Sequence, residues 1–172
     1  MSPSLALQAG IRARLIADPA VIEAVPAADI TDKHGRVARF PSVTFGEFRE
    51  YVLAPMKRDS TRVSLDLHVW TDTPGTRDAK RLTDTLRRAL RDGPWKAEGH
   101  IVMDLAFSGA RYLPDPENPD ITHGVISFDA FMLEEPDPSE VTPPPASGDG
   151  ECGCDADFDP GDLTLVFNNR LI

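Results

Sequence analysis

The sequence predicts an α+β domain in which two helices pack on one face of a small, mostly antiparallel sheet. Two observations predict this fold class. One segment alternates strictly between apolar and polar residues, and two amphipathic segments with helical spacing separate the strand-like ones. The expected order of elements is helix, strand, strand, helix, strand, strand. Elements in this order bury their apolar faces by packing helices against an antiparallel sheet.

The alternating segment, residues 62–71, is the strongest strand signal in the chain. Its apolar positions, which point to one side, are Val63, Leu65, Leu67 and Val69. Alternation over this length indicates a strand with one face on a core. Trp70 lies on the polar side of this strand, so we expect it at a boundary, partly packed, with its indole N–H near a partner.

Apolar residues at helical spacing predict the two helices. In residues 4–17, Leu5, Ile11 and Leu15 fall on one face, and Asp18-Pro19 ends the helix, with one further turn at residues 21–25. The second helix is capped by Thr73 or Thr76 and stops at Gly93-Pro94. Its expected buried stripe consists of Ala79, Leu82, Leu86, Ala89 and Leu90.

Three further strands complete the expected sheet. They cover residues 41–46, 100–107 and 124–133. The second of these places Ile101, Met103, Leu105 and Phe107 on one side. Residues 47–60, which include Lys57 and Arg58, are too polar and too long for a tight turn, so we expect a projecting loop there.

The charge of the chain is divided unevenly at residue 133. Residues 1–133 contain 17 Lys+Arg and 18 Asp+Glu, and residues 134–172 contain one Arg and ten acids. The corresponding net charges, −1 and −9, give the −10 of the whole chain. The sequence therefore predicts a near-neutral domain over residues 1–133 and an acidic arm over residues 134–172. This balance argues against affinity for nucleic-acid phosphates.

The acidic arm begins as a linker and ends in a strand-like segment. Its prolines, which exclude a helix or a sheet interior, are Pro136, Pro138, Pro143, Pro144 and Pro145. Near its end, Leu163, Leu165 and Phe167 alternate with Thr164 and Val166. We expect an arm that reaches a different subunit or protein and docks this strand on an open sheet edge. The alternative is a strand that folds back on its own domain.

Histidines and cysteines were weighed as metal ligands. The four histidines, His34, His68, His100 and His123, match no helical zinc motif. Cys152 and Cys154 supply only two thiolates, and the acidic stretch after them lacks the glycine and glutamate of a calcium loop. The sequence therefore favours solvated residues over a metal site, and we expect no catalytic residue and no cofactor.

The stretch ARYLPDPENPDITHGVI, residues 110–126, joins the last two expected strands through a crossing rich in proline and acids. One interpretation is an ordinary hairpin loop. The other is an interface loop, because prolines and charges beside a strand edge restrict which partner fits. The candidate contact residues in the crossing are Asp115, Glu117, Asn118 and Asp120.

Four segments carry a family resemblance by their order and spacing: RFPSVTFG (39–46), SLDLHVWT (64–71), ARYLPDP (110–116) and HGVISF (123–128). Together they resemble the tail-terminator, or tail-completion, proteins of long-tailed bacteriophages and gene transfer agents. The resemblance covers about residues 4–133 and implies a structural virion protein, not an enzyme. It implies a hexameric ring that caps the tail tube, ends its polymerisation and joins the tail to the head-side connector.

The resemblance also implies the partners and the location. The expected partners are five further copies of the chain in a homo-hexamer, the major tail tube protein and the head-side connector or stopper protein. DNA is expected to pass without specific binding, and no membrane is involved. The expected location is the tail of a phage-like particle assembled in the bacterial cytoplasm. The interface candidates are Lys57, Arg58, Asp115, Glu117, Asn118, Asp120, Leu163, Leu165 and Phe167.

Two alternative functions stay open: a head-tail connector (stopper) ring and, from another class, a small metal-dependent enzyme. The chain also departs from the family in two places. The crossing at residues 115–122 looks longer than the compact turn of the family, and the acidic arm has no counterpart in it.

Overall fold

The computed structural model of the protein describes residues 1–33, 35, 37–52 and 60–135. The elements, in chain order, are α1 (Pro3–Ala17), α2 (Pro19–Ala24), a 3₁₀ turn (Ala27–Asp29), β1 (Ile30–Thr31), β2 (Ser42–Val52), β3 (Ser60–Thr71), α3 (Arg77–Leu90), β4 (Trp95–Ala97), β5 (His100–Pro114) and β6 (Thr122–Glu134). The predicted order is confirmed for the long elements. The further turn expected at residues 21–25 corresponds to α2, and the short strands β1 and β4 are added to the predicted order.

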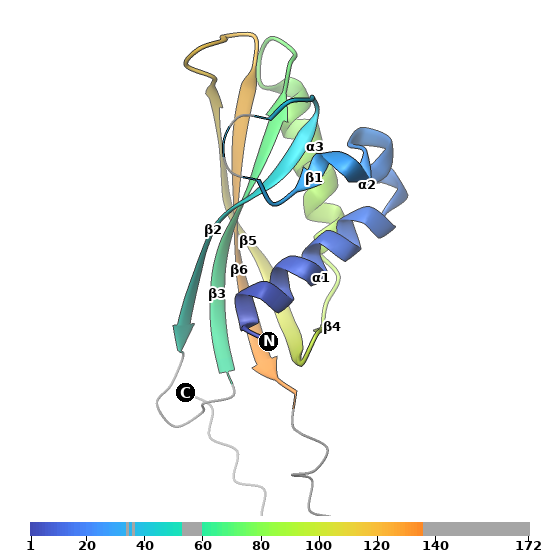
Figure 1. Cartoon of the computed structure of the whole chain (residues 1–172), viewed down its shortest axis with the longest axis vertical. Helices are drawn as coiled ribbons and strands as arrows, with labels where there is room; N and C mark the ends of the chain where they lie inside the picture. Colours follow the sequence, from blue (N-terminus) through green and yellow to red (C-terminus); the bar gives the residue numbers. More distant parts are fainter. Residues whose placement is uncertain (34, 36, 53–59, 136–172) are drawn as a thin grey trace, which may run out of the picture. The chain divides into compact units, whose positions relative to one another are not determined.

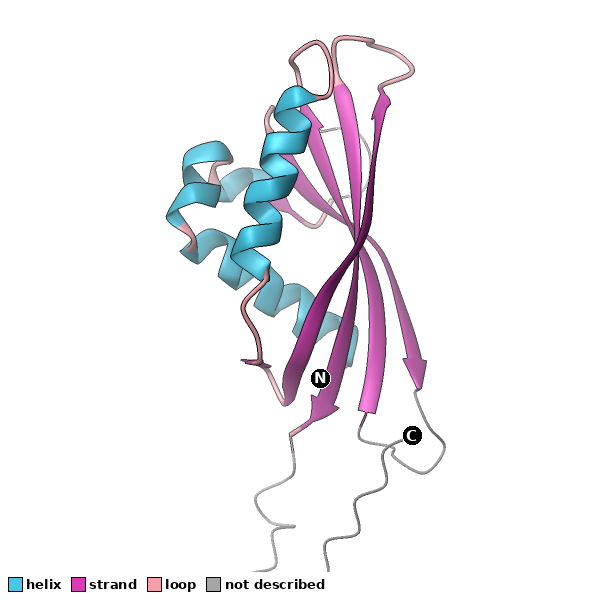
Figure 2. Ribbon diagram, turned by 180° about the vertical axis from the view of Figure 1, so that it is seen from behind, coloured by secondary structure: helices cyan, strands magenta, loops and turns pink. Residues whose placement is uncertain are grey.

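The six strands form one sheet in the order β1-β2-β3-β6-β5-β4. Neighbouring strands run antiparallel except β1 and β2, which are parallel. The three helices lie together on one face of the sheet (Figure 1), and the view from behind shows the same two layers (Figure 2). The predicted α+β class is therefore confirmed, and one sheet face carries no helix among the described residues.

Helix α1 begins and ends at residues whose chemistry suits a helix terminus. The Ser2 hydroxyl accepts a hydrogen bond from the backbone N–H of Leu5 at 3.4 Å, and Pro3 occupies the first turn. At the other end the Asp18 carboxylate accepts from the N–H of Ala20 at 2.8 Å and so begins α2. The predicted end at Asp18-Pro19 is confirmed. Leu5 was expected on the buried face, but its side chain is 51% exposed.

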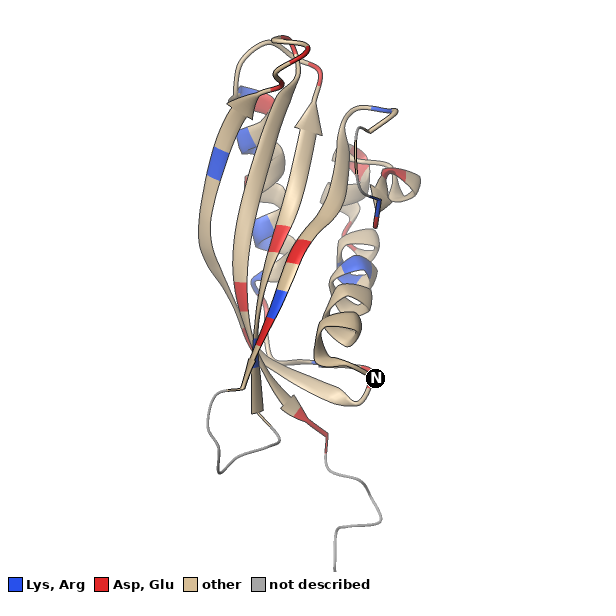
Figure 3. Ribbon diagram, turned by 60° about the vertical axis from the view of Figure 1, so that its left-hand side comes forward, with Lys and Arg blue, Asp and Glu red and all other residues tan. Residues whose placement is uncertain are grey.

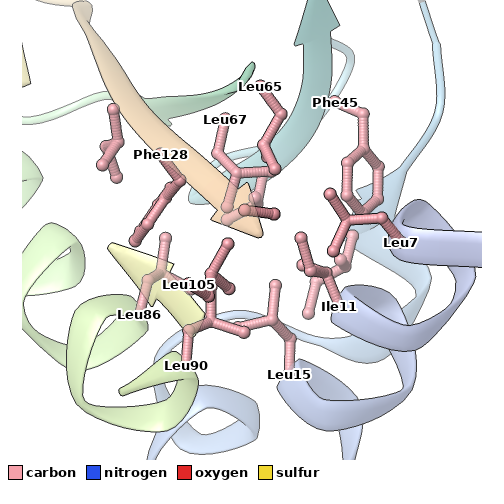
Figure 4. Packing of buried hydrophobic residues seen from close by; sticks show 14 of the residues in the cluster. Leu7, Ile11, Leu15, Phe45, Leu65, Leu67, Leu86, Leu90, Leu105 and Phe128 are labelled. Atoms are coloured by element: carbon pink, nitrogen blue, oxygen red, sulfur yellow. The ribbon is translucent and has the colours of Figure 1, made fainter. Parts of the chain in front are cut away.

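Helix α3 confirms the predicted apolar stripe. Ala79, Leu82, Leu86 and Leu90 are buried, and Ala89 packs against them. The cap differs from the prediction: Thr76 occupies the N-cap position, but its side chain makes no capping hydrogen bond. The core lies between the sheet and the two longer helices. Leucine and isoleucine side chains of α1 and α3 meet those of β3 and β5 there (Figure 4).

The projecting loop expected at residues 47–60 is wrong for its first part, because β2 continues to Val52. A bulge between Phe45 and Phe48 inserts one extra residue, and the aromatic ring of Phe48 returns to the core. Residues 47–52 look polar in sequence because all of their side chains except that of Phe48 are exposed in this half of β2. Residues 53–59, with Lys57 and Arg58, lie outside the described residues.

The buried stripe expected in residues 100–107 is also wrong in part. Ile101 is half-buried, Met103 is 43% exposed and Phe107 is 38% exposed, whereas Val102 and Leu105 are buried. Strand β5 contains two irregularities, between Val102 and Asp104 and between Phe107 and Gly109. Each inserts one residue and so reverses which side of the alternation faces the core.

Candidate interface surfaces

Two strands of the sheet have outer edges that are only partly covered. Strand β1 pairs with β2 at Val43 and Thr44, and β4 pairs with β5 at residues 100–102. Within the described part of the chain, no strand pairs with the outer side of residues 45–52 or of residues 103–114. Such edges offer backbone N–H and C=O groups to a further strand, so each is a candidate interface. We call them the β2 edge and the β5 edge.

The β5 edge is bordered by arginines of α3. The Arg87 guanidinium lies 4.0 Å from the ring centroid of Phe107, and that ring stands edge-on to Phe128 at 6.0 Å between centroids. Arg88 pairs with Asp84 one turn earlier at 2.5 Å. A hollow of about 160 Å³ lies there, lined by Leu105, Phe107 and Phe128 and by Asp84, Arg87, Arg88 and Arg91 of the helix side. It has an apolar floor and a rim of three arginines and one carboxylate.

The sheet face without helices carries a network of polar side chains across β3 and β6. The Asp66 carboxylate accepts a hydrogen bond from the Ser127 hydroxyl at 2.6 Å. The Asp129 carboxylate accepts from the Ser64 hydroxyl at 2.5 Å and from the Arg62 guanidinium at 2.9 Å. The Ser64 hydrogen bond is the main reason that the pKa of Asp129 lies below its ordinary value. We call this surface the open face.

Basic and acidic residues are interspersed along the strands of the sheet (Figure 3). On β2, Arg49 makes two hydrogen bonds of 2.9 Å to the Glu47 carboxylate. Arg62 is paired with Asp129 as described above. Because each of these cations is close to a carboxylate, the surface offers little net positive potential to a phosphate backbone.

Three aromatic rings stack at the upper end of the open face. The rings of Trp70 and His123 are 3.9 Å apart and inclined by 7°, and His68 lies 4.8 Å from His123. Nδ1 of His68 and Nε2 of His123 are hydrogen-bonded at 2.8 Å. Burial lowers the pKa of His123 to about 4, with a further contribution from His68 and Arg111, and burial also lowers the pKa of His68. Both imidazoles are therefore neutral at pH 7.

Trp70 is half-buried, as predicted for a residue at a boundary. Its indole N–H, however, has no hydrogen-bond partner among the described residues, although we expected one. Buried N–H groups without a partner are rare in folded proteins and costly to leave unpaired.

The crossing between β5 and β6 is a hairpin loop held by its own hydrogen bonds. The Asp115 carboxylate accepts from the backbone N–H of Glu117 at 2.8 Å and of Asn118 at 3.1 Å. The backbone of Asp115 and Ile121 closes the loop at 2.9 Å, and the Asn118 side chain accepts from the N–H of Asp120 at 3.1 Å. A loop fixed in this way presents Glu117 and Asp120 in one defined arrangement at the end of the sheet. Its role as an interface stays a prediction.

The predicted site residues fall into two groups. Asp115, Glu117, Asn118 and Asp120 lie together in the hairpin loop. Lys57, Arg58, Leu163, Leu165 and Phe167, together with Cys152 and Cys154, lie outside the described residues.

The histidines considered for a metal site do not converge. His68 and His123 meet, but His100 contacts the backbone oxygen of Glu98 at 3.1 Å, on the edge of the sheet. His34 lies outside the described residues. Among the residues that the structure describes, no group of three or more His, Cys, Asp or Glu side chains is placed to hold a metal ion.

Sequence reasoning missed the two free edges and the paired histidines. The edges are free because β1 and β4 are too short to cover β2 and β5. A strand of two or three residues leaves no periodic pattern in the sequence. His68 lay on the polar side of its predicted strand and His123 before the next one. Only the pairing of β3 with β6 brings them together.

Within the described ranges, no helix has both the length and the apolar character needed to cross a membrane. No curated protein matches the sequence. The solved structures that are similar to the chain include the following two. A chain of the virion of a native gene transfer agent particle has 20% sequence identity and a TM-score of 0.66, covering 76% of this chain and 96% of that one. The gp17 protein of bacteriophage SPP1 has 21% identity and a TM-score of 0.49, covering 74% of this chain and 88% of that one.

The first of these likenesses shows that the two chains share a fold, with the helices and the sheet in the same arrangement. The profile of the family described as tail completion protein gp17 matches residues 9–133, which include β2, β3, β5 and α3 and most of α1 and β6. Because this match spans well over half of the sequence, the chain belongs to the tail completion protein family of phage and gene-transfer-agent virions.

Proposed function

We propose that six copies of this tail completion protein form a ring on the finished tail tube. The ring ends polymerisation of the major tail tube protein and joins the tail to the head-side connector. The observation that carries this proposal is the pair of free edges on opposite sides of one sheet, belonging to β2 and β5. A subunit in a ring needs two different contact surfaces, because each copy meets its two neighbours head to tail.

The charge of the domain supports passage of DNA through such a ring. Residues 1–133 have a net charge of −1, and the open face pairs Arg49 and Arg62 with carboxylates. A protein that bound the DNA backbone tightly would need an excess of unpaired cations. DNA therefore passes without being held, and the protein acts as a structural component with no chemical step.

The hairpin loop at residues 115–121 is the proposed contact with a neighbouring protein of the particle. It lies at the upper end of the sheet (Figure 1), and hydrogen bonds from its backbone N–H groups fix the loop that carries the exposed residues Glu117 and Asp120. A preorganised loop loses little conformational entropy on binding, which favours a defined partner. A charge-reversing variant with Lys at positions 117 and 120 is expected to reduce head-tail joining and to leave the ring intact.

The test is made on particles and on the purified chain. Deleting the gene is expected to yield tails of uncontrolled length that do not join heads, and images of the intact neck are expected to show one six-membered layer of this chain on the tube. Native mass spectrometry, with tail tubes present if necessary, checks the number of copies. Tails of normal length joined to heads in the deletion strain contradict the proposal. A layer located on the head side, away from the tube, would instead assign the stopper role.

A further inference from the structure

The acidic arm and the β5 edge have complementary chemistry. We infer that residues 163–167 of one copy add as a strand to the β5 edge of a neighbouring copy, with the acids before them bound by the arginines of α3. The inference rests on the proposed ring, which supplies the neighbour. The arm lies outside the part of the chain that matches the family, because that match ends at residue 133. The contact is therefore an addition that this chain makes to the family's fold.

The first support is the backbone of β5. Residues 103–114 have no strand on their outer side among the described residues, while β6 occupies their inner side. An added strand obtains most of its attachment from backbone hydrogen bonds, and alternate side chains select the sequence that fits. Residues 163–167 alternate Leu, Thr, Leu, Val and Phe, which is a composition typical of strands.

The second support is the hollow between α3 and the β5 edge. Its floor is formed by Leu105, Phe107 and Phe128, and Phe107 remains 38% exposed there although its ring faces the helical side of the sheet. An apolar side chain of the arm, such as Phe167, would cover this surface. Covering exposed apolar area stabilises a contact by about 25 cal/mol for each Å² removed from water.

The third support is charge. Helix α3 contains five Lys+Arg and two Asp, a net charge of +3, and Arg91 follows it at the C-cap. The arm carries ten acids and one Arg, and its acids closest to the strand-like segment are Glu151, Asp155, Asp157, Asp159 and Asp162. Arg88 is already paired with Asp84 at the hollow, so Arg87 and Arg91 are the cations that meet these carboxylates in the charge-assisted hydrogen bonds that fix an arm in register.

Charge also selects the β5 edge over the β2 edge. The exposed charged residues of β2 are Glu47, Arg49 and Glu50, which together carry a net charge of −1, and the Arg49 guanidinium is already held by Glu47. An acidic segment is not attracted to that edge. The Glu50 carboxylate in addition accepts a hydrogen bond from the backbone N–H of Ser4 at 2.9 Å, which places α1 beside the same edge.

The length and composition of the linker favour a neighbouring copy. Strand β6 ends at Glu134, and residues 136–162 separate it from the strand-like segment. Proline-rich linkers are extended and semi-rigid at about 3 Å per residue, so this linker spans up to about 80 Å. Five of its six prolines lie within residues 136–145 and oppose an immediate return to the domain they leave.

Cysteine cross-linking of the full-length chain tests the inference. Cys152 and Cys154 are replaced with Ser, and Val166→Cys in the arm is combined with Ala106→Cys on the β5 edge. Under a bifunctional maleimide we expect a ladder of covalent dimers and larger species on a denaturing gel. The matched control combines Val166→Cys with Arg49→Cys on the β2 edge and is expected to give no ladder. A cross-linked product confined to the monomer shows that the arm folds back on its own domain, and it overturns the inference. A ladder of equal yield in the control overturns it too, as does the absence of any cross-linked product.

A pair of charge variants tests the role of α3. Arg87→Gln with Arg91→Gln removes two cations at the hollow and leaves the Arg88–Asp84 pair in place, and we expect loss of most of the cross-linked product. Arg77→Gln with Arg81→Gln removes the same charge near the other end of α3 and is expected to leave the yield unchanged. Equal yields from the two pairs overturn the charge argument. Native mass spectrometry in parallel separates the two proposals: a six-membered ring without cross-linking refutes the arm contact alone, and absence of any ring refutes the proposed function.

Discussion

The indole ring of Trp95 lies so close to Gly10 that a Cβ added at this glycine would stand 2.2 Å from Cζ3 of Trp95. This contact packs α1 against β4, the short strand that covers the lower end of β5. The Arg14 guanidinium lies 5.3 Å from the centroid of the same ring. The position of α1 on the sheet therefore depends on the absence of a side chain at one residue, in the middle of a helix where glycine is otherwise unfavourable.

Gly10→Ala is expected to destabilise the domain by about 1–3 kcal/mol, because the crowded ring must move. This loss outweighs the gain of about 1 kcal/mol that alanine brings to a helix interior. Urea unfolding measures the stability, and the emission of Trp95 in a Trp70→Phe background reports the local shift. Ala9→Gly, at the neighbouring exposed position, is the control and is expected to leave Trp95 emission unchanged. A more stable Gly10→Ala variant with unaltered emission would show that the ring is not held there.

Leu86→Ala is expected to cost about 2–5 kcal/mol of the free energy of unfolding, because it leaves a cavity in the centre of the core. Leu86 is fully buried on α3, and the residues around it come from both the sheet and α1. Leu5→Ala removes the same atoms from a side chain that is 51% exposed, and is expected to change stability by less than about 0.5 kcal/mol. Thermal or urea unfolding of both variants checks the difference, and similar losses would place Leu5 in the core instead.

Stability is expected to fall as pH is lowered from about 6.5 towards 4, because the folded state prefers a neutral His123. The pKa of His123 is about 4 in the folded chain, below its ordinary value of 6.5. Between these values the unfolded chain binds more protons, so acid favours unfolding, and the effect is complete below the folded pKa. Since the side chain is half exposed, we expect a loss of only about 1–2 kcal/mol over this range.

The measurement is the urea midpoint at several pH values in the wild type and in His123→Gln, which cannot titrate. The variant is expected to lose the part of the pH dependence that His123 contributes, and His68, whose pKa is also lowered by burial, retains its own part. Trp70 emission in a Trp95→Phe background provides a second probe, since the Trp70 and His123 rings are stacked at 3.9 Å. A transition in that emission near pH 6.5 would contradict the lowered pKa. The titration of Asp129, whose pKa lies below its ordinary 3.8, falls at still lower pH and does not interfere.

Partial protection of Trp70 from a soluble quencher is expected in the same Trp95→Phe variant. Its ring is half-buried against His123 on the open face, and no helix covers that face among the described residues. Acrylamide quenching compared with that of free tryptophan gives the protected fraction. Complete protection in both monomer and ring would show that another part of the chain covers Trp70.

The sequence predicted the regular parts of this fold well because their side chains follow one period throughout. Strand β3 alternates from Val63 to Thr71, and the stripe of α3 repeats without interruption, so burial could be inferred there from spacing alone. The predictions failed where one inserted residue changed the period, at the bulge before Phe48 and at Met103. A bulge leaves no mark in the local pattern that distinguishes it from the end of a strand.

The candidate interfaces could be predicted only in part, for a different reason. The hairpin loop was identified from its prolines and acids, which are local signals. The two free edges depend on which strands are neighbours and on how far β1 and β4 extend along them. The contact of His68 with His123 likewise depends on β3 lying beside β6. Neighbour relations between distant segments are a property of the tertiary structure and have no signature in a single sequence.

The central position of the β3–β6 pair has a consequence for how the chain folds. Strands β2 and β3 are consecutive in sequence, as are β5 and β6, so each pair can form early from local contacts. The seam between the pairs joins residues far apart in the chain, with His68 and His123 separated by 55 positions. Closing so long a loop costs conformational entropy before any stabilising contact between β3 and β6 has formed. Folds dominated by such long-range contacts form slowly. Docking of the two strand pairs, with α3 between them, therefore sets the folding rate, and substitutions along the seam are expected to slow folding more than those at either outer edge.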